Sequence, residues 1–171
     1  MVKRLIFSSE TCIGCQNCEL SCSMKNSGVF STFYSRIRSI RFSNEILFFL
    51  LVCFQCEQPL CVKRCKEGAI FKEEKTGLIK IDNSKCNNCF QCIEACPYGA
   101  IFYGKGLDHP IKCELCGGDP ECIKFCPTNA LSFKETKSGD FLDQQKVAIK
   151  IHKKRMLDEK EKNIDTKDFG K

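Results

Sequence analysis

The chain has 171 residues, of which sixteen are cysteines and 28% are charged, and its formal net charge is +6. Cysteine near the 8–10% level is typical of chains held together by disulfides or metal rather than by apolar packing alone. Residues 1–10 lack the apolar stretch of a secretion signal, and the longest apolar run, residues 46–54, is about half of the ~20 residues that cross a bilayer. We therefore expect a cytoplasmic protein without membrane insertion, in which dense cysteine indicates metal.

The sixteen cysteines form four quartets, with none left over. The first and third quartets have the spacing C-x2-C-x2-C-x3-C, which is typical of ligands to 4Fe-4S clusters. The second and fourth keep the opening C-x2-C and the closing C-x3-C but widen the middle gap to four and five residues. We predict four 4Fe-4S clusters, with every cysteine as an iron ligand. In chain order the quartets are Cys12, Cys15, Cys18 and Cys22; Cys53, Cys56, Cys61 and Cys65; Cys86, Cys89, Cys92 and Cys96; and Cys113, Cys116, Cys122 and Cys126.

This spacing has a mechanical reason. Three thiolates a few residues apart can wrap one loop around a cluster, while the amides of the loop point toward its sulfurs. The fourth cysteine is carried into a short helix and faces another cluster, so quartets are expected to work in pairs. Structural zinc is the main alternative, although zinc sites normally use two well-separated cysteine pairs. A disulfide framework would require an oxidising compartment.

Metal binding changes the meaning of the net charge. Lys and Arg outnumber Asp and Glu by 27 to 21, a balance that ordinarily suggests nucleic acid. Sixteen thiolates would lower the charge of +6 by sixteen, and four cluster cores of about +2 each would raise it again, to roughly −2 in all. The basic residues then compensate the cofactors, and we expect no nucleic-acid partner.

Two features lie between the first and second quartets. Arg36, Arg38 and Arg41 alternate with other residues as in an exposed strand. We interpret them as a solvated edge, with contact to a partner or to a cluster as the alternative. The apolar residues 46–52 predict a buried strand that excludes water from the cluster at Cys53, and an obligate subunit interface is the alternative.

The sequence after the later quartets repeats at about thirty residues. The segments Gly68-Ala69-Ile70, Gly99-Ala100-Ile101 and Asn129-Ala130-Leu131 follow the last cysteines of the second, third and fourth quartets. Each unit is expected to form a strand, a cysteine loop, a short helix, a turn and a second strand. Two such units related by a pseudo-twofold axis would make one ferredoxin-like domain of the α+β class.

Residues 135–171 contain no cysteine and are highly charged. Val147, Ile151 and Met156 have roughly helical spacing, which predicts a helix that docks on this chain or on a partner, with disorder toward residue 171. His109 and His152 are interpreted as surface residues, because the cysteines already complete four sites. Motifs for catalysis or nucleotide binding are missing from the sequence, so we expect no substrate chemistry here.

Over residues 3–134 these motifs resemble the four-cluster electron-transfer subunits similar to the iron-sulfur subunit of dimethyl sulfoxide reductase. The resemblance implies that the first quartet pairs with the fourth, and the second with the third. It also implies an outer dicluster unit from residues 1–52 and 106–134, interlocked with an inner unit at 53–105 and followed by a charged helical extension at 135–171. We number the four implied cysteine sets by the quartet that supplies three of the ligands. Set I is Cys12, Cys15, Cys18 and Cys126; set II is Cys53, Cys56, Cys61 and Cys96; set III is Cys86, Cys89, Cys92 and Cys65; and set IV is Cys113, Cys116, Cys122 and Cys22.

Within this family, the segments 18–23, 35–38 and 112–122 are most similar to small subunits that partner tungsten-containing aldehyde oxidoreductases. This resemblance implies a non-catalytic subunit that connects a large tungsten- or molybdenum-pterin subunit to soluble ferredoxin or to a further redox subunit. Similar subunits serve formate dehydrogenases, hydrogenases and carbon monoxide dehydrogenases, and a free-standing polyferredoxin is another alternative. Ser23 and Lys66 stand where the family has proline, and the short gap in the fourth quartet argues against a membrane-anchor contact.

Overall fold

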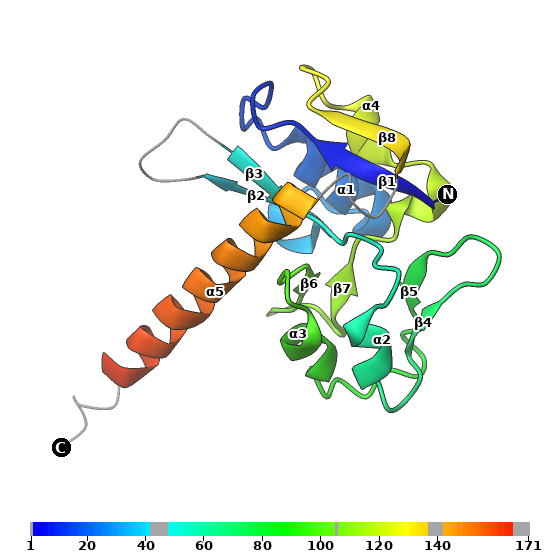
Figure 1. Cartoon of the computed structure of the whole chain (residues 1–171), viewed down its shortest axis with the longest axis vertical. Helices are drawn as coiled ribbons and strands as arrows, with labels where there is room; N and C mark the ends of the chain where they lie inside the picture. Colours follow the sequence, from blue (N-terminus) through cyan, green and yellow to red (C-terminus); the bar gives the residue numbers. More distant parts are fainter. Residues whose placement is uncertain (1, 42–47, 105, 137–141, 166–171) are drawn as a thin grey trace.

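The computed structural model describes residues 2–41, 48–104, 106–136 and 142–165. Within them, the strands form two-stranded antiparallel sheets, and short helices lie between these sheets (Figure 1). This combination of strands and helices agrees with the predicted α+β class. The pairs are β1 (Val2–Phe7) with β8 (Leu131–Thr136), β2 (Arg38–Arg41) with β3 (Phe48–Leu51), β4 (Ile70–Lys72) with β5 (Ile79–Ile81), and β6 (Ile101–Phe102) with β7 (Ile111–Lys112). The helices are α1 (Asn17–Ser27), α2 (Leu60–Arg64), α3 (Gln91–Ala95), α4 (Glu121–Lys124) and α5 (Leu142–Asp165), with 3₁₀ turns η1 (Thr32–Tyr34) and η2 (Leu115–Gly118).

Strand, cysteine loop and short helix follow one another at all four quartets, which confirms the predicted repeat. The second, third and fourth units also end in a strand, namely β4, β6 and β8. The first unit differs, because α1 continues to Ser27 and is followed by η1. Since no Gly-Ala turn follows Cys22, this helix ends only at Gly28, whose φ is 67° and whose N–H donates to the Met24 carbonyl at 3.0 Å.

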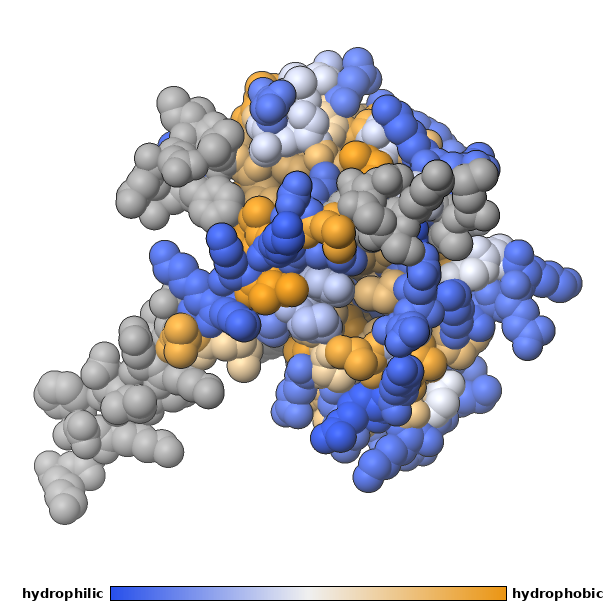
Figure 2. Space-filling model, viewed as in Figure 1, coloured by the Kyte–Doolittle hydropathy of each residue, from blue (hydrophilic) through white to orange (hydrophobic). Residues whose placement is uncertain are grey.

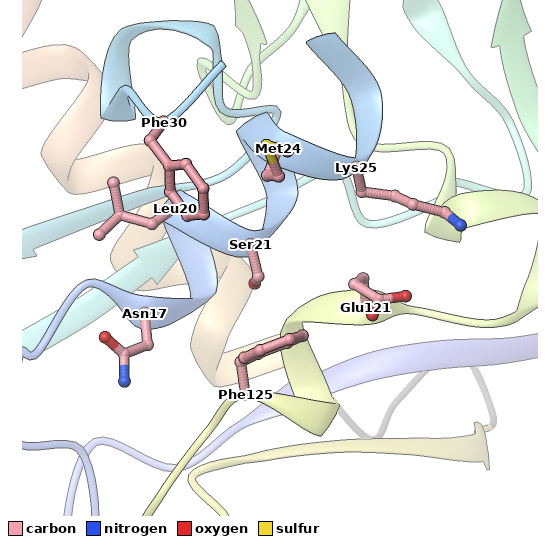
Figure 3. Close-up of a pocket in the computed structure, with 8 residues that line it drawn as sticks. All are labelled: Asn17, Leu20, Ser21, Met24, Lys25, Phe30, Glu121 and Phe125. Atoms are coloured by element: carbon pink, nitrogen blue, oxygen red, sulfur yellow. The ribbon is translucent and has the colours of Figure 1, made fainter. Parts of the chain in front are cut away.

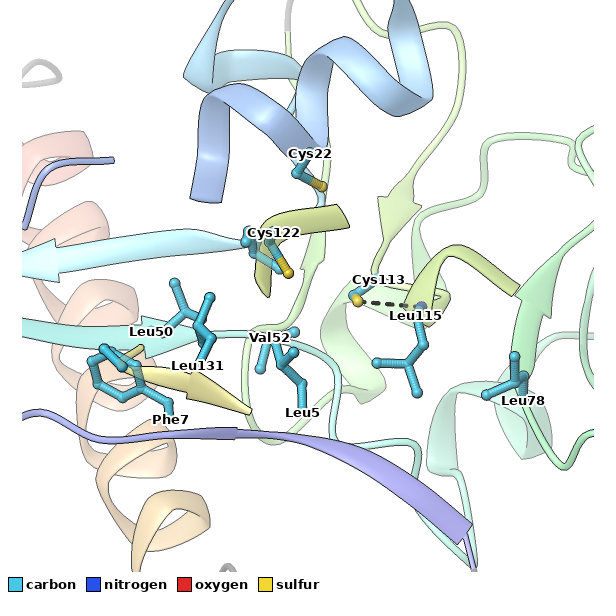
Figure 4. Close-up of a cluster of buried hydrophobic side chains, with 12 residues drawn as sticks. Leu5, Phe7, Cys22, Leu50, Val52, Leu78, Cys113, Leu115, Cys122 and Leu131 are labelled. Atoms are coloured by element: carbon cyan, nitrogen blue, oxygen red, sulfur yellow. Dashed lines mark hydrogen bonds between the residues drawn. The ribbon is translucent and has the colours of Figure 1, made fainter. Parts of the chain in front are cut away.

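The apolar run before the second quartet forms β3, and its residues 49–52 are buried, which confirms a core strand. Alternate side chains enter two different apolar clusters, as the period of a strand requires. Leu50 and Val52 pack beside β1 and β8 (Figure 4), whereas Phe49 and Leu51 pack beneath α5. Residues 46 and 47 of the predicted strand lie outside the described residues.

The basic residues before β3 differ from the expected solvated edge. Arg36 pairs with Glu114 at 3.1 Å, and the guanidinium of Arg38 lies 4.8 Å from the centre of the Phe102 ring. Both arginines are half-buried, and Arg41 alone of the three is exposed. The prediction is therefore wrong for Arg36 and Arg38, because the fourth cysteine loop and β6 pack against this segment from far along the chain.

The first half of α5 lies on the body of the molecule, and its second half runs away from it (Figure 1). Ala148 and Ile151 are buried in the cluster that contains Phe49, and Val147 packs at its edge. Docking on this chain through Val147 and Ile151 is thereby confirmed, whereas Met156 is 42% exposed. The predicted disorder toward residue 171 falls outside the described residues. No described helix is long and apolar enough to be a candidate membrane span.

The two histidines are half-buried rather than freely exposed. His152 lies against the turn after the third quartet, where a Cβ added at Gly99 would come within 2.5 Å of its Nδ1 atom. The prediction of a plain surface residue is therefore wrong for His152. The docking of α5 brings it there, and no local pattern indicates that contact.

Candidate metal centres

Three cavities of equal volume, about 20 Å³ each, are each lined by four cysteines. Every cavity combines three cysteines of one quartet with the last cysteine of another. The three groups of cysteines are those of sets I, II and III. The structure therefore places side by side residues that are more than a hundred positions apart in the sequence, Cys12 and Cys126 among them.

The cysteines of set IV converge where α1 packs on α4. Figure 4 shows the sulfur atoms of Cys22, Cys113 and Cys122 facing a common region. Burial raises the pKa of the Cys122 thiol strongly, and the neighbouring thiols of Cys113, Cys22 and Cys116 raise it further. Such mutual repulsion between ionisable thiols requires that the four side chains lie close together.

All sixteen cysteines are free thiols, and the four sets leave none outside them. Among the described residues, no three His, Cys, Asp or Glu side chains surround one point closely enough to hold a single metal ion. The cysteines of sets I to III surround cavities instead. The chemistry of each set, four thiols around one space, fits a 4Fe-4S cluster, and ligation residue by residue stays a prediction.

Left-handed residues shape every cysteine loop. In the first and third loops they stand two positions apart, and alternation of left- and right-handed residues turns main-chain N–H groups toward one concave side, an arrangement that binds anions. A non-glycine residue in this conformation costs roughly 1–2 kcal/mol, so a bound anionic group gives these loops a reason to adopt it. The residues before the second cysteine are Gly14 (φ 68°), Gln55 (49°), Asn88 (58°) and Leu115 (53°). Those after it with positive φ are Gln16, Phe90 and Gly117.

The last cysteine of every quartet accepts a hydrogen bond from a main-chain N–H group. In three quartets the donor lies in the repeated turn, which gives the repeat a structural reason. At Cys22, which that turn does not follow, the donor is the Arg36 N–H at 3.3 Å, fourteen residues away. Hydrogen bonds of this kind stabilise a thiolate. The other three pairs are Ile70 to Cys65 at 3.5 Å, Ala100 to Cys96 at 3.4 Å and Ala130 to Cys126 at 3.2 Å.

Burial alone would keep several of these thiols protonated. It raises the pKa of Cys18 and Cys61 to about 12, and that of Cys92 to about 11. Cys126 differs: burial opposes its ionisation, but hydrogen bonds from the N–H groups of Leu131 and Ala130, together with those from Thr128, lower its pKa. A coordinating metal deprotonates such thiols outright, so these environments suit metal ligands better than free cysteines.

The four sets follow one another in the order I, IV, II, III. Cys22, Cys113 and Cys122 of set IV belong to one buried cluster, against which Cys12, Cys18 and Cys126 of set I pack. Cys53 of set II packs against the same cluster. Sets II and III are joined by α2 and α3, which pack together and carry cysteines of both sets.

The exposure of the cysteines differs between the ends and the middle of this row. Cys15 of set I and Cys89 of set III are exposed, whereas every cysteine of sets II and IV is buried or half-buried. The two ends of the row therefore lie nearest the surface, and the two middle sets lie inside.

Two buried polar side chains lie beside these sets, and sequence patterns did not predict them. Gln55 is 2% exposed, and its Nε2 donates to the Cys113 carbonyl at 2.8 Å. Arg4 is 4% exposed, and its guanidinium donates to Thr136 Oγ1 at 3.1 Å and to the Gln55 carbonyl at 3.5 Å. The one available signal was the place of Gln55, which occupies the position of Gly14 in the first loop.

A larger hollow of about 390 Å³ lies outside the cysteine sets, between α1 and α4 (Figure 3). Leu20, Met24, Phe30 and Phe125 supply its apolar lining. Phe30 is 71% exposed and Phe125 is 55% exposed. Sequence patterns did not indicate this hollow, because its two walls come from opposite ends of the chain.

Charged and polar side chains cover most of the face of the molecule shown in Figure 2, and the apolar residues on it are scattered between them.

Comparison with known proteins agrees with the geometry of the cysteine sets. Residues 44–136 match the family described as the 4Fe-4S dicluster domain. The chain belongs to this family.

The B subunit of anaerobic dimethyl sulfoxide reductase from Escherichia coli K12 is 33% identical over 143 residues, which cover 73% of this chain and 69% of that subunit. The predicted resemblance to iron-sulfur subunits of this type is confirmed. The present chain is an electron-transfer protein with 4Fe-4S clusters rather than a catalytic subunit.

Two further relatives differ in length. The polyferredoxin-like subunit of an aliphatic sulfonate oxidoreductase from Pyrococcus furiosus is 29% identical, and the match covers 90% of this chain and 88% of that subunit. Subunit beta of an NADH-dependent phenylglyoxylate dehydrogenase from Aromatoleum evansii is 33% identical over 81% of this chain. The match covers 33% of that subunit, so the present chain spans about a third of its length.

Proposed function

We propose that this chain is a four-cluster subunit that connects a large catalytic oxidoreductase subunit to soluble ferredoxin or to a further redox subunit. When bound, each 4Fe-4S cluster would exchange single electrons with its neighbours. The observation that carries the proposal is the row of four cysteine sets, with sets I and III nearest the surface at its two ends. Such a row joins two exposed points of the molecule through its interior.

In this proposal, all four sets are iron ligands and the chain forms two interlocked ferredoxin-like units. Residues 1–52 and 106–134 would make the outer unit around sets I and IV, and 53–105 the inner unit around sets II and III. Figure 1 supports this division for most elements, since α1, α4, β1 and β8 lie together and α2, α3 and β4 to β6 lie together, whereas β7, from the outer segment 106–134, lies with the inner elements. The pairing of β6 with β7 crosses the boundary at 105/106 and so joins the units. Residues 135–171 would be the docked extension.

The proposed large partner carries a pterin-bound metal, with tungsten as in aldehyde oxidoreductases or with molybdenum. The segments 18–23, 35–38 and 112–122 support this choice by their resemblance to small subunits of that class. Relatives named as subunits of a sulfonate oxidoreductase and of dimethyl sulfoxide reductase support a partnered subunit more generally. Formate dehydrogenase, hydrogenase and carbon monoxide dehydrogenase are the alternative complexes. A cytoplasmic location belongs to the same proposal.

Anaerobic purification of the tagged chain from its native cells tests this proposal. We expect a brown complex with about sixteen irons and sixteen acid-labile sulfides per chain, together with one large subunit that contains tungsten or molybdenum. An iron-loaded chain that purifies alone would favour the free-standing polyferredoxin. A colourless chain with zinc would refute the cluster assignment.

A further inference from the structure

A lysine lies buried between two of the cysteine sets. Lys112 ends β7, directly before Cys113 of set IV, and only 1% of its surface is exposed. Its Nζ donates to the main-chain carbonyl of Ile79, in β5, and to that of Cys113 at 2.9 Å. The ion pairs found among the described residues do not include Lys112. Carbonyl dipoles therefore surround this ammonium, but no carboxylate of the described residues neutralises it.

A buried charge without a counter-charge is strongly unfavourable, with an effective penalty of several kcal/mol per ion. Residues in such surroundings persist when an anion is close by. The cysteine sets offer such anions on both sides of Lys112, because Cys113 of set IV follows it directly and Ile79, which accepts from its Nζ, lines the cavity of set II. Four thiolates around a core of about +2 leave each site with a charge of roughly −2, which is the kind of counter-charge that Lys112 lacks within the protein.

Lys112 lies between two sets. Ile79, whose carbonyl accepts a hydrogen bond from the Lys112 Nζ, lines the cavity of set II together with its four cysteines. The second acceptor of the Nζ is the carbonyl of Cys113, a cysteine of set IV. One cation is thus bonded to residues that border both middle sets of the row.

Gln55 fixes the two residues whose carbonyls accept from Lys112. Its Oε1 accepts the Ile79 N–H at 2.8 Å, and its Nε2 donates to the Cys113 carbonyl at 2.8 Å. The same Cys113 carbonyl and the Ile79 carbonyl are the two acceptors of Lys112. The four residues form a closed ring of hydrogen bonds that joins the second cysteine loop, β5 and the fourth cysteine loop. A long flexible side chain is thereby kept in one position.

We propose that Lys112 sets the potentials of the two middle centres: its ammonium is the counter-charge shared by sets II and IV and raises the reduction potentials of the clusters bound there. This inference rests on the proposed function. Reduction adds one negative charge to a cluster, and a cation nearby in a medium of low dielectric constant stabilises the reduced form. The row passes from the outer to the inner unit between sets IV and II. By raising the potentials of these two clusters, Lys112 allows electrons to occupy them on the way from one unit to the other. Sets I and III, at the ends of the row, are expected to feel it least.

Charge substitutions at Lys112, compared with one at an exposed lysine, test the inference. Lys112→Met removes the charge and keeps the aliphatic chain, Lys112→Gln keeps a hydrogen-bond donor without the charge, and Lys112→Arg keeps the charge. Lys124→Met is the control at an exposed site, because Lys124 also stands close to cysteines in the sequence, two residues from Cys122 and Cys126, but its side chain is 49% exposed. Its charge is therefore screened by water. Iron and sulfide are counted first, and the potential of each cluster is then measured by redox titration with electron paramagnetic resonance.

The expected result is a fall of two of the four potentials in Lys112→Met and Lys112→Gln. The ratio of reduced to oxidised cluster at a fixed potential should change about tenfold, which corresponds to ~59 mV for a one-electron couple. Lys112→Arg and Lys124→Met should keep all four potentials near those of the unmodified chain. If Lys112→Met does not load with iron, the comparison of Lys112→Gln with Lys112→Arg decides. Equal potentials in those two loaded variants would overturn the role of Lys112, whereas an unmodified chain without about sixteen irons would overturn the proposed function itself.

Discussion

The outer part of the molecule (β1, β8, α1 and α4) and the inner part (α2, α3 and β4 to β7) use the same cysteine spacing but are held together differently. In the outer part, two six-residue strands more than 120 positions apart in the sequence pair along their whole length. The strand pairs of the inner part, β4–β5 and β6–β7, connect neighbouring strands and are only three and two residues long. The inner part is therefore closed by contacts between neighbouring segments, and the outer part by a contact between segments distant in the sequence.

One of the two last cysteines of the outer part, Cys22, shows the same difference, whereas Cys126 is bound by the Ala130 N–H of the turn that follows it. Cys65 and Cys96 are bound by N–H groups of the turns that directly follow them. Cys22 depends on the distant Arg36 N–H, and the Arg36 side chain is anchored by Glu114 in the fourth cysteine loop. A repeated local motif can thus be replaced by a long-range contact when the sequence after the cysteine changes. The variants below test this contrast.

Removal of a last cysteine has the largest expected effect. Cys96→Ala in the inner part and Cys126→Ala in the outer part should each remove or convert one cluster, a loss of up to about four of sixteen irons. Because Cys96 belongs to set II, Cys96→Ala should abolish the same paramagnetic signal as Cys61→Ala and leave intact the signal that Cys92→Ala abolishes. Iron content and electron paramagnetic resonance measure both effects. A match between Cys96→Ala and Cys92→Ala would mean that the quartets do not exchange their last cysteines.

A substitution in α5 tests the apolar cluster that covers both parts. Ile151 is 8% exposed and packs with residues of β3, β6 and β7. Ile151→Ala should lower the free energy of unfolding by about 2–5 kcal/mol, through lost burial and the cavity that remains. Met156→Ala is the control, since that side chain is 42% exposed, and its effect should be within about 0.5 kcal/mol. Anaerobic denaturant unfolding measures the difference, and equal effects would mean that α5 contributes no packing energy.

Alanine substitutions at two equivalent glycines of the repeat distinguish the cost of backbone strain from the cost of a tertiary contact. Gly68 and Gly99 have φ values of 63° and 61°, so alanine at either position should cost roughly 1–2 kcal/mol. Nothing lies within 4 Å of a Cβ at Gly68, whereas a Cβ at Gly99 would meet the ring of His152. We expect Gly99→Ala to lower the thermal midpoint more than Gly68→Ala. In a chain with His152→Ala the two variants should become equal, and a persistent gap would assign the extra cost to another contact.

The smallest expected effect concerns the ion pair of the outer part. Arg36→Met breaks the 3.1 Å ion pair with Glu114, and the side chains of both residues are about four-fifths buried. The substitution should lower the free energy of unfolding by about 1 kcal/mol. Arg41→Met, in the same segment but exposed, should change the free energy of unfolding by less than about 0.5 kcal/mol. The paramagnetic signals of sets I and IV should be lost at lower denaturant than those of sets II and III. Indistinguishable variants would show that the Arg36 side chain does not stabilise the outer part.

Sequence patterns predicted the features that depend on neighbouring residues. The order of strand, cysteine loop and helix and the buried β3 came from spacing and periodicity, which act over a few residues. The docked face of α5 was also predicted, because Val147 and Ile151 recur at helical spacing. The solvated interpretation of Arg36 and the surface interpretation of His152 failed for one common reason. Each side chain meets a segment distant in the sequence, Glu114 in one case and Gly99 in the other.

The sequence by itself determined how many centres there are and which three cysteines share a loop, because a short loop can bring only its own thiols around one space. Tertiary structure alone decided where each fourth cysteine goes, since that depends on how α1 packs on α4 and α2 on α3. It also decided which polar groups enter the interior. Lys112 precedes a cysteine like any other residue in the sequence, and only the packing of β7 against β5 turns it into a buried cation between two sets.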